Sequence, residues 1–381
     1  MRRHIDWAVE NGIEVCVADF LPPDRVILPS SFQFASLLPR RAKAIYQPRI
    51  HKTGPRSVRI GALRLQNIVD SFEPHLIHSY MLGVYSEMCL QCEHRPLVVS
   101  AWGYLNGLLT KRPTPKDKRW IRRLRNGADA LLVENPNLLN ALATLTGPPL
   151  RLDCFPIGVD GSVFHPGYEE KSAAWRFVLD IPANATVLLS PRGWSEIYGQ
   201  HHIMKAFALA YHRLDQPLVL TLVGLGRKRN PEAYAQKVLD LGASLGVAHA
   251  IRWIPQVPYQ DMPGLYALAD VVINYPSSDA FPSTLLEAAA CARPVITSHL
   301  PAYRNTFIAE CFRLVEPENP EALADAIVEV IGTASTVWSP RAQTTRDVVL
   351  GEYDETVQKQ HLMALYSEII HKESRQVRLG K

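Results

Sequence analysis

Hydrophobic and polar residues are patterned in two ways along this chain, and each pattern predicts a different element. Short β-branched or leucine-rich runs predict buried strands, whereas apolar residues that recur three or four positions apart predict helices. In the second half of the chain six such runs alternate with helical segments, at 187–192, 218–224, 251–255, 271–275, 295–298 and 312–315. This alternation predicts a parallel sheet covered by helices on both faces, with ligands at the carboxyl ends of the strands.

The first half shows a similar alternation with more interruptions. Strands are predicted at 13–18, 76–80, 96–103, 128–133 and 150–155, and helices at 1–11 and 57–72. Residues 22–55 are rich in proline, which predicts either a loop region facing a cleft or a plain surface loop. Further helices are predicted at 318–331 and 351–372, so the fold class is α/β throughout.

Composition narrows the class of protein. With 381 residues the chain is long enough for two or three domains, and 47% hydrophobic and 20% charged residues indicate a folded globular protein. No apolar run reaches the length of a membrane span, and the first residues lack the apolar core of a signal peptide, so we expect a cytoplasmic protein. A net charge of +4 gives no reason to expect nucleic acid as a partner.

The six cysteines are scattered through apolar segments, which predicts reduced core residues and no disulfide framework. Cys89 and Cys92 form a lone C-x-x-C. A redox or metal site is the alternative there, but no second pair follows at zinc spacing.

The stretch 271–298 carries the sharpest candidate chemistry. It predicts strand, loop, helix and strand, with Asp279 in the loop and Glu287 inside the helix. Ser283 or Thr284 is expected to cap the helix start, whose free N–H groups and dipole suit a phosphate or diphosphate. The two acids suit hydroxyl groups on either side of that diphosphate. The alternative is a surface Asp and a helix Glu of any doubly wound domain.

The pattern of an acid, seven residues and Glu287, followed by Ala-x-Ala-Cys-x-x-Pro-Val, resembles the retaining glycosyltransferases of family four. Ser-Asp-x-x-Pro-x-x-Leu-Leu-Glu, with Asp279 where a Glu is usual, is similar to a subset of that family. The resemblance implies the GT-B fold, in which two Rossmann-like doubly wound lobes face a cleft. It implies that Asp279 touches the donor sugar and Glu287 the ribose of the nucleotide, with the N–H groups near Thr284 and Leu285 meeting the leaving group.

Other segments of the second lobe extend the resemblance. In Ser-Pro-Arg, Arg192 matches an arginine that binds the donor diphosphate. The Gly224-x-Gly226 turn matches one that admits the nucleotide, and Gln256 and Val257 stand where backbone meets the base. The usual lysine after Arg192 is absent. Either Arg227 or Lys228 substitutes, or binding depends on Arg192 and the helix end.

The first lobe departs further from the family. Tyr80 stands for the second histidine of a His-x-His strand end, and Trp102 and Gly103 occupy the turn beside the donor sugar; these three residues are the predicted acceptor side. The family's first strand and glycine-rich loop are missing, so we expect that the start is truncated or that the lobe is rebuilt.

Residues 111–125, KRPTPKDKRWIRRLR, predict a basic helix with Trp120 on its apolar side. Such a helix suits an anionic membrane surface or a phosphorylated acceptor, and the alternative is a solvated helix that packs on the sheet.

The predicted domains are therefore an acceptor-side lobe at 1–165, a nucleotide-sugar-binding lobe at 166–340, and a C-terminal helical segment at 341–381 that braces the first lobe. The resemblance implies transfer of a hexose from a nucleotide-diphosphate sugar to a glycan, lipid-linked or small-molecule acceptor, with retention at the anomeric carbon. We expect no metal and no further cofactor, because no Asp-x-Asp stands at a strand end. We expect a cytoplasmic location, with peripheral contact at the inner membrane face. The alternatives are an epimerase or hydrolase on the same fold and a non-catalytic nucleotide-sugar-binding subunit.

Overall fold

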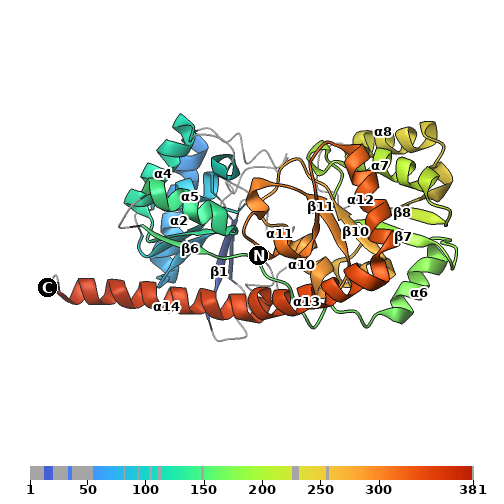
Figure 1. The fold of residues 1–381 in the computed structure, drawn as a ribbon. Coiled ribbons are helices and arrows are strands. Elements are labelled where there is room, and N and C mark those ends of the chain that lie inside the picture. The colour runs from blue at the N-terminus through green and yellow to red at the C-terminus, as the bar shows by residue number, and fades with distance from the viewer. Residues whose placement is uncertain are drawn as a thin grey trace. The chain divides into compact units, whose positions relative to one another are not determined.

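The computed structural model describes residues 13–19, 33–36, 55–80, 82–92, 94–102, 105–109, 113–146, 150–224, 231–254 and 257–379. The chain divides into two compact units (Figure 1). Unit 1 comprises Met1–Phe155 and Lys359–Lys381, and unit 2 comprises Pro156–Gln358. The predicted helix at 1–11 lies outside the described residues.

The boundaries between these two units, after Phe155 and after Gln358, differ from the domain boundaries at 165 and 340 that the sequence indicated. The segment after Phe155 belongs to unit 2 because its backbone pairs with a helix end there. The Val159 N–H donates to the Tyr353 carbonyl over 2.9 Å, and the Glu355 N–H donates to the Val159 carbonyl over 2.8 Å.

Unit 2 contains one sheet of six parallel strands, which confirms the predicted strands of the second half. The strands are β7 (Thr186–Ser190), β8 (Leu218–Val223), β9 (Ile251–Ile254), β10 (Val271–Asn274), β11 (Val295–Ser298) and β12 (Arg313–Val315). They lie in the order β12-β11-β10-β7-β8-β9. Strands β7, β8, β10 and β11 are almost wholly buried, as expected for a parallel sheet covered on both faces.

Helices cover both faces of this sheet (Figure 1). They are α6 (Glu169–Val178), α7 (Gln200–Arg213), α8 (Pro231–Ser244), α9 (Met262–Leu268), α10 (Ser283–Ala290), α11 (Phe307–Cys311), α12 (Pro320–Gly332) and α13 (Ser339–Tyr353). One face packs against α7, α8 and α12 in a single hydrophobic core. Helices α6, α9, α10 and α13 contact one another in series on the other face.

The order of the strands creates a switch point between β7 and β10. From the central strand β7 the chain proceeds outward to β8 and β9, and then returns to add β10, β11 and β12 on the opposite side. Strands β7 and β10 are hydrogen-bonded neighbours. The connections that follow them run to opposite faces, and in open α/β sheets the carboxyl ends at such a point form the ligand-binding crevice.

Unit 1 has a smaller parallel sheet in the order β3-β4-β5-β6, and a separate parallel pair of β1 and β2. The strands are β1 (Cys16–Asp19), β2 (Gln33–Ser36), β3 (Ile77–Ser79), β4 (Leu97–Ser100), β5 (Ala130–Val133) and β6 (Arg151–Cys154). One face of the β3-β4-β5-β6 sheet packs against α2 (Pro55–Phe72), α3 (Val84–Gln91), α4 (Pro115–Gly127) and α5 (Pro136–Thr146).

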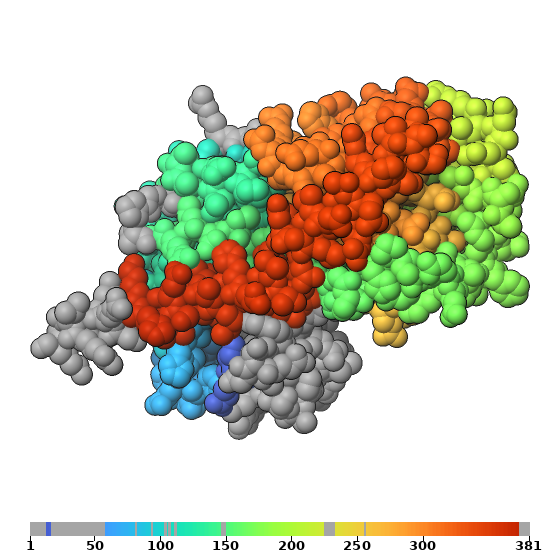
Figure 2. Space-filling view, turned by 60° about the horizontal axis from the view of Figure 1, so that its bottom comes forward, coloured from blue at the N-terminus to red at the C-terminus, as the bar shows by residue number. Residues whose placement is uncertain are grey.

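The C-terminal helix α14 (Glu355–Leu379) covers the other face of this sheet. Leu362, Leu365 and Ile369 pack against alternate residues of β4 and β5, and Figure 2 shows the red surface of this helix beside green residues of unit 1. The sequence predicted a helix that begins at 351, whereas α13 ends at Tyr353 and a new helix begins at Glu355. Asp354 is extended, and its carboxylate accepts the Thr356 N–H over 2.8 Å, so an N-cap separates the two helices.

No helix in the described part of the chain is long and apolar enough to cross a membrane.

Candidate active site

Arg192 and Asp279 meet at the switch point of the unit 2 sheet. Arg192 lies two residues beyond β7, and Asp279 lies in the loop after β10. Because the two strands are neighbours, the side chains form an ion pair with Nη2 to Oδ2 at 2.9 Å. Their side chains are only 12% and 16% exposed, so this pair is largely shielded from solvent.

The Asp279 carboxylate uses both oxygens. Oδ2 accepts from Arg192, and Oδ1 accepts the Ala280 N–H over 2.9 Å. Burial raises the pKa of Asp279, while the Arg192 charge and the Ala280 N–H lower it. Burial has the larger effect on the pKa, so the charged carboxylate depends on these two contacts for its stability and its orientation.

Arg192 has further partners that hold its side chain and its backbone. Nη1 is 3.4 Å from the Thr284 hydroxyl oxygen, and the guanidinium carbon lies 4.0 Å from the centre of the Tyr198 ring. The Gln200 side-chain amide donates to the carbonyls of Arg192 and Gly193 at 3.1 and 2.8 Å. Sequence reasoning missed Tyr198 and Gln200. The sequence signal for Tyr198 was that an aromatic residue stands in the run 196–199, where the family that the sequence resembles usually has a lysine.

The start of α10 differs from the prediction that Ser283 or Thr284 caps it. Pro282 stands at the N-cap, and its ring offers no side-chain acceptor. The Leu285 N–H donates to the Pro282 carbonyl over 3.1 Å. Thr284 faces Arg192 and belongs to the first turn of the helix. The tight turn therefore already engages the Leu285 N–H, one of the donors that the sequence assigned to a ligand.

Glu287 follows Thr284 by three residues on α10, so both side chains lie on the same face of the helix. Glu287 is 6% exposed, and its Oε2 accepts the hydroxyl of the buried Tyr266 over 2.8 Å. Burial, and then the Glu287 charge, raise the pKa of Tyr266 well above its usual value. Tyr266 on α9 therefore remains a donor and fixes the carboxylate, a partner that the sequence did not reveal.

Two of the remaining donor-side candidates, Gly224 and Val257, follow β8 and β9 at the same end of the sheet. The Gly224 N–H, directly after β8, donates to the Ile254 carbonyl over 2.7 Å, and Val257 is buried. Gly226 and Gln256 lie outside the described residues. The suggested substitute cations Arg227 and Lys228 lie there too.

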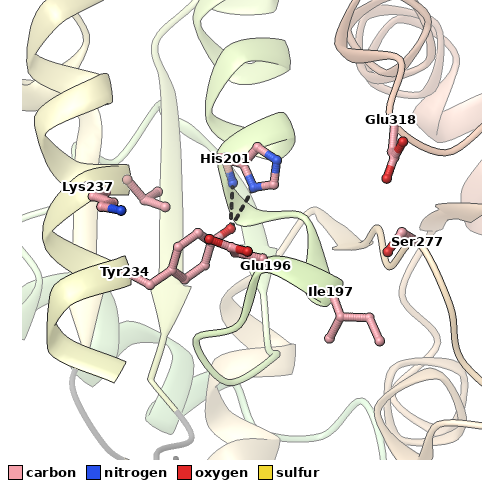
Figure 3. A pocket seen from close by; sticks show the side chains of 8 residues that line it. Glu196, Ile197, His201, Tyr234, Lys237, Ser277 and Glu318 are labelled. Atoms are coloured by element: carbon pink, nitrogen blue, oxygen red, sulfur yellow. Dashed lines mark hydrogen bonds between the residues drawn. The ribbon is translucent and has the colours of Figure 1, made fainter. Parts of the chain in front are cut away.

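A cavity of about 580 Å³ lies beside the short 3-10 helix η4 (Glu196–Tyr198) in unit 2 (Figure 3). Its lining includes Glu196, Ile197, His201, Tyr234 and Glu318. The His201 Nδ1 is 2.7 Å from the Tyr234 hydroxyl, and burial lowers the pKa of His201. This cavity was not predicted from the sequence, because its residues come from four separate segments.

Two of the predicted acceptor-side residues, Tyr80 and Trp102, lie just beyond the ends of β3 and β4 in unit 1. The Tyr80 and Trp102 rings are in edge contact at 5.3 Å, and burial raises the pKa of Tyr80 to about 12. Tyr80 also stacks on His78 at 4.0 Å, and His78 contacts the hydroxyls of Tyr366 at 2.5 Å and Ser100 at 2.8 Å. Gly103 lies outside the described residues. The Tyr366 contact joins residues 288 positions apart, so the sequence pattern held no signal for it.

The described residues contain no group of three or more His, Cys, Asp or Glu side chains placed to hold a metal ion. All six cysteines are described, and none is in a disulfide. Burial raises the pKa of Cys89 to about 12 and that of Cys92 to about 11, so both thiols are protonated at neutral pH. A protonated thiol is a weaker nucleophile than a thiolate.

Comparison with solved structures defines the fold as GT-B. The chain resembles the sucrose-phosphate synthase of Thermosynechococcus elongatus with a TM-score of 0.80 at 18% identity, covering 97% of this chain and 92% of that one. It resembles Anabaena HepE in complex with UDP-glucose with a TM-score of 0.74 at 16% identity, covering 96% and 95%. The predicted fold class is confirmed.

Sequence comparison matches one segment of the chain to a family of glycosyl transferases. Residues 171–336, which include Arg192, Asp279 and Glu287, match the family model of the group 1 glycosyl transferases. A D-inositol 3-phosphate glycosyltransferase of Streptosporangium roseum is 30% identical over 247 residues, which cover 59% of this chain and 55% of that relative. The chain thus spans little more than half the length of this relative.

Proposed function

We propose that this protein is a glycosyltransferase that moves a hexose from a nucleotide-diphosphate sugar to an acceptor, with retention at the anomeric carbon. The observation that carries the proposal is the 2.9 Å pair of Arg192 and Asp279 at the β7/β10 switch point. The match of residues 171–336 to the group 1 model supports it, as do the names of the relatives and the UDP-glucose bound to HepE.

Each site residue has a role in the proposed reaction that fits the chemistry of its side chain. In the reaction the bond between the anomeric carbon and the diphosphate oxygen breaks, and both electrons stay on the diphosphate. The acceptor oxygen bonds to the carbon, and its proton passes to the departing diphosphate, which leaves as a nucleoside diphosphate. Arg192 offers five N–H donors, of which the two described bonds use two, and its fixed charge stabilises the leaving diphosphate. Asp279 accepts from the donor sugar, and Glu287 accepts from the ribose. No metal is part of this proposal.

The experiment compares Asp279→Asn and Glu287→Gln with the wild type. First, thermal shift with UDP-, GDP- and ADP-sugars identifies a donor, because selective binding stabilises the folded state. Glu287→Gln is expected to raise KM for that donor with little change in kcat, while Asp279→Asn mainly lowers kcat. Wild-type transfer rates in both variants would show that the site is placed wrongly.

The same assay separates the alternatives. Donor incubated without acceptor yields a new nucleotide sugar or free sugar only if the protein is an epimerase or hydrolase. Donor binding without turnover in the presence of a broad acceptor set favours a non-catalytic binding subunit.

We further propose that Tyr80 and Trp102 of unit 1 lie on the acceptor side, and that the acceptor is a glycan, a lipid-linked sugar or a small molecule. Replacing Trp102 with Ala is expected to raise KM for the acceptor and to leave donor affinity unchanged. A change in donor affinity alone would contradict this assignment.

Helix α4 supports a proposal of peripheral contact with the anionic inner face of a cytoplasmic membrane. Its exposed cations are Lys116, Lys118, Arg119, Arg122 and Arg125. Ile121 and Leu124 are buried in the core of unit 1, so the contact is electrostatic and does not insert apolar side chains.

Vesicles test the membrane contact. The wild type is expected to sediment with phosphatidylglycerol vesicles at low salt, but not with phosphatidylcholine vesicles or at high salt. The combined change Arg119→Glu, Arg122→Glu, Arg125→Glu should abolish sedimentation. Three Lys→Glu changes at Lys171, Lys205 and Lys237 of unit 2 match it in net charge. Equal loss in both variants would refute a specific role for α4.

A further inference from the structure

The turn η4 places an aromatic ring against the arginine of the proposed donor site. We propose that Tyr198 is a positioning residue, which holds the Arg192 guanidinium so that its N–H edge meets the donor diphosphate. The inference rests on the proposed function and adds to it a residue that does not touch the substrate. Its basis is the 4.0 Å approach of the guanidinium carbon to the centre of the Tyr198 ring.

The geometry of a guanidinium makes this contact compatible with ligand binding. A ring below the plane attracts the cation through its face, whereas hydrogen bonds to a diphosphate use the N–H groups in the plane. A second carboxylate in the place of Tyr198 would consume in-plane donors. Tyr198 therefore restrains Arg192 without using the donors that the ligand needs.

Restraint matters here because Asp279 competes for the same cation. The ion pair to Asp279 and the 3.4 Å contact to Thr284 draw the guanidinium toward the loop after β10 and the first turn of α10. The long arginine side chain has many rotamers, and their loss on binding weakens affinity. The contact with the face of the Tyr198 ring removes part of that freedom before the ligand arrives.

Tyr198 can act in this way because η4 is itself held on both sides. The Ser277 N–H donates to the Ile197 carbonyl over 2.8 Å, which ties η4 to the loop that carries Asp279. Figure 3 shows Ile197 and Ser277 on the same side of the cavity beside η4. Gly199 then closes the turn with a φ of 68°, and a Cβ there would lie only 2.3 Å from the Tyr275 carbonyl oxygen.

The first test uses UDP and uridine as probes, by calorimetry on the whole chain. Tyr198→Leu is expected to weaken UDP binding by about threefold to thirtyfold, the range of a partly desolvated cation–π contact. Tyr198→Phe keeps the ring and should stay within about twofold of the wild type. Uridine lacks the diphosphate, so its affinity should not change in either variant. Equal losses for UDP and uridine would show general damage to the fold and would overturn the inference.

The second test needs no ligand. A double-mutant cycle of Tyr198→Leu and Arg192→Met, measured on the unfolding equilibrium, should give a coupling of about threefold to thirtyfold. Coupling near unity would refute the role of Tyr198 even if the wild type binds UDP normally. Failure of the wild type to bind UDP, ADP or GDP would refute the proposed function and the assigned ligand, whatever the coupling between Tyr198 and Arg192.

Discussion

Replacing Gly199 with alanine tests how η4 and the end of β10 are joined. Gly199 has a φ of 68°, in the left-handed region, and an added Cβ would lie 2.3 Å from the Tyr275 carbonyl oxygen. The backbone conformation costs about 1–2 kcal/mol for a non-glycine residue. Overpacking costs about 1–3 kcal/mol more, while a stiffer unfolded chain returns about 0.4–1 kcal/mol. We therefore expect Gly199→Ala to lower the free energy of unfolding by about 1–4.5 kcal/mol.

Tyr275 cannot easily move away from the added methyl group. It is 1% exposed, its hydroxyl donates to the Glu316 carbonyl, and the same hydroxyl accepts the Asn319 N–H over 3.1 Å. Any shift would move the end of β10 and the loop that carries Asp279. Gly199→Ala is therefore expected to weaken donor binding as well as stability.

Urea unfolding provides the assay, and two other glycines provide matched controls. Gly246 has a φ of 77° but nothing within 4 Å of an added Cβ, so Gly246→Ala measures the backbone cost alone. Gly332 ends α12 with neither restriction, so Gly332→Ala should be neutral or stabilising by up to about 1 kcal/mol. The midpoint should fall with an unchanged slope. If Gly199→Ala destabilises no more than Gly246→Ala, the close approach to Tyr275 does not exist in solution.

Three further expectations follow from the buried polar groups. Tyr266→Phe should destabilise unit 2 by about 1.5–3 kcal/mol, because it removes the 2.8 Å hydrogen bond to the Glu287 carboxylate; a denaturation midpoint equal to that of the wild type would exclude this bond. Arg192→Gln should raise the pKa of Asp279 further, because Arg192 lowers it, and carbon-detected NMR titration measures the change; an unchanged or lower pKa would contradict the pair. A folded-state pKa above the unfolded one costs stability as pH rises through that interval, so the variant should lose stability over a wider range of pH than the wild type. Cys89 should resist iodoacetamide at pH 8 in the folded protein, because burial raises its pKa to about 12, and rapid labelling would contradict its burial.

Local patterns were sufficient for most elements of the fold. The six strands of unit 2 were predicted within one or two residues. Four of them, β7, β8, β10 and β11, are almost wholly buried, and a buried parallel strand has a nearly continuous apolar sequence. The break at Asp354 was not predicted. Residues on both sides favour helix, and only the side-chain bond to the Thr356 N–H reveals the cap.

The candidate site likewise contains residues that the sequence indicated and residues that it did not. Arg192 and Asp279 could be named from the sequence because each follows a predicted strand and lies in a segment that resembles a glycosyltransferase motif, and the structure places them 2.9 Å apart. Tyr266 could not be named, since a tyrosine in an apolar helix has the same sequence signal whether its hydroxyl reaches Glu287 or solvent.

The sequence by itself determined the α/β class, the parallel sheet of unit 2 and the strand ends at which the polar residues collect, because these depend on periodicity and on residues near one another in the chain. Tertiary structure alone decided which groups restrain Arg192 and Glu287, which residues of α14 meet the unit 1 sheet, and that Pro282 rather than a hydroxyl begins α10. Contacts such as those between Tyr198 and Arg192, or Tyr366 and His78, depend on the direction of single side chains after packing. Local propensity carries no information about that direction.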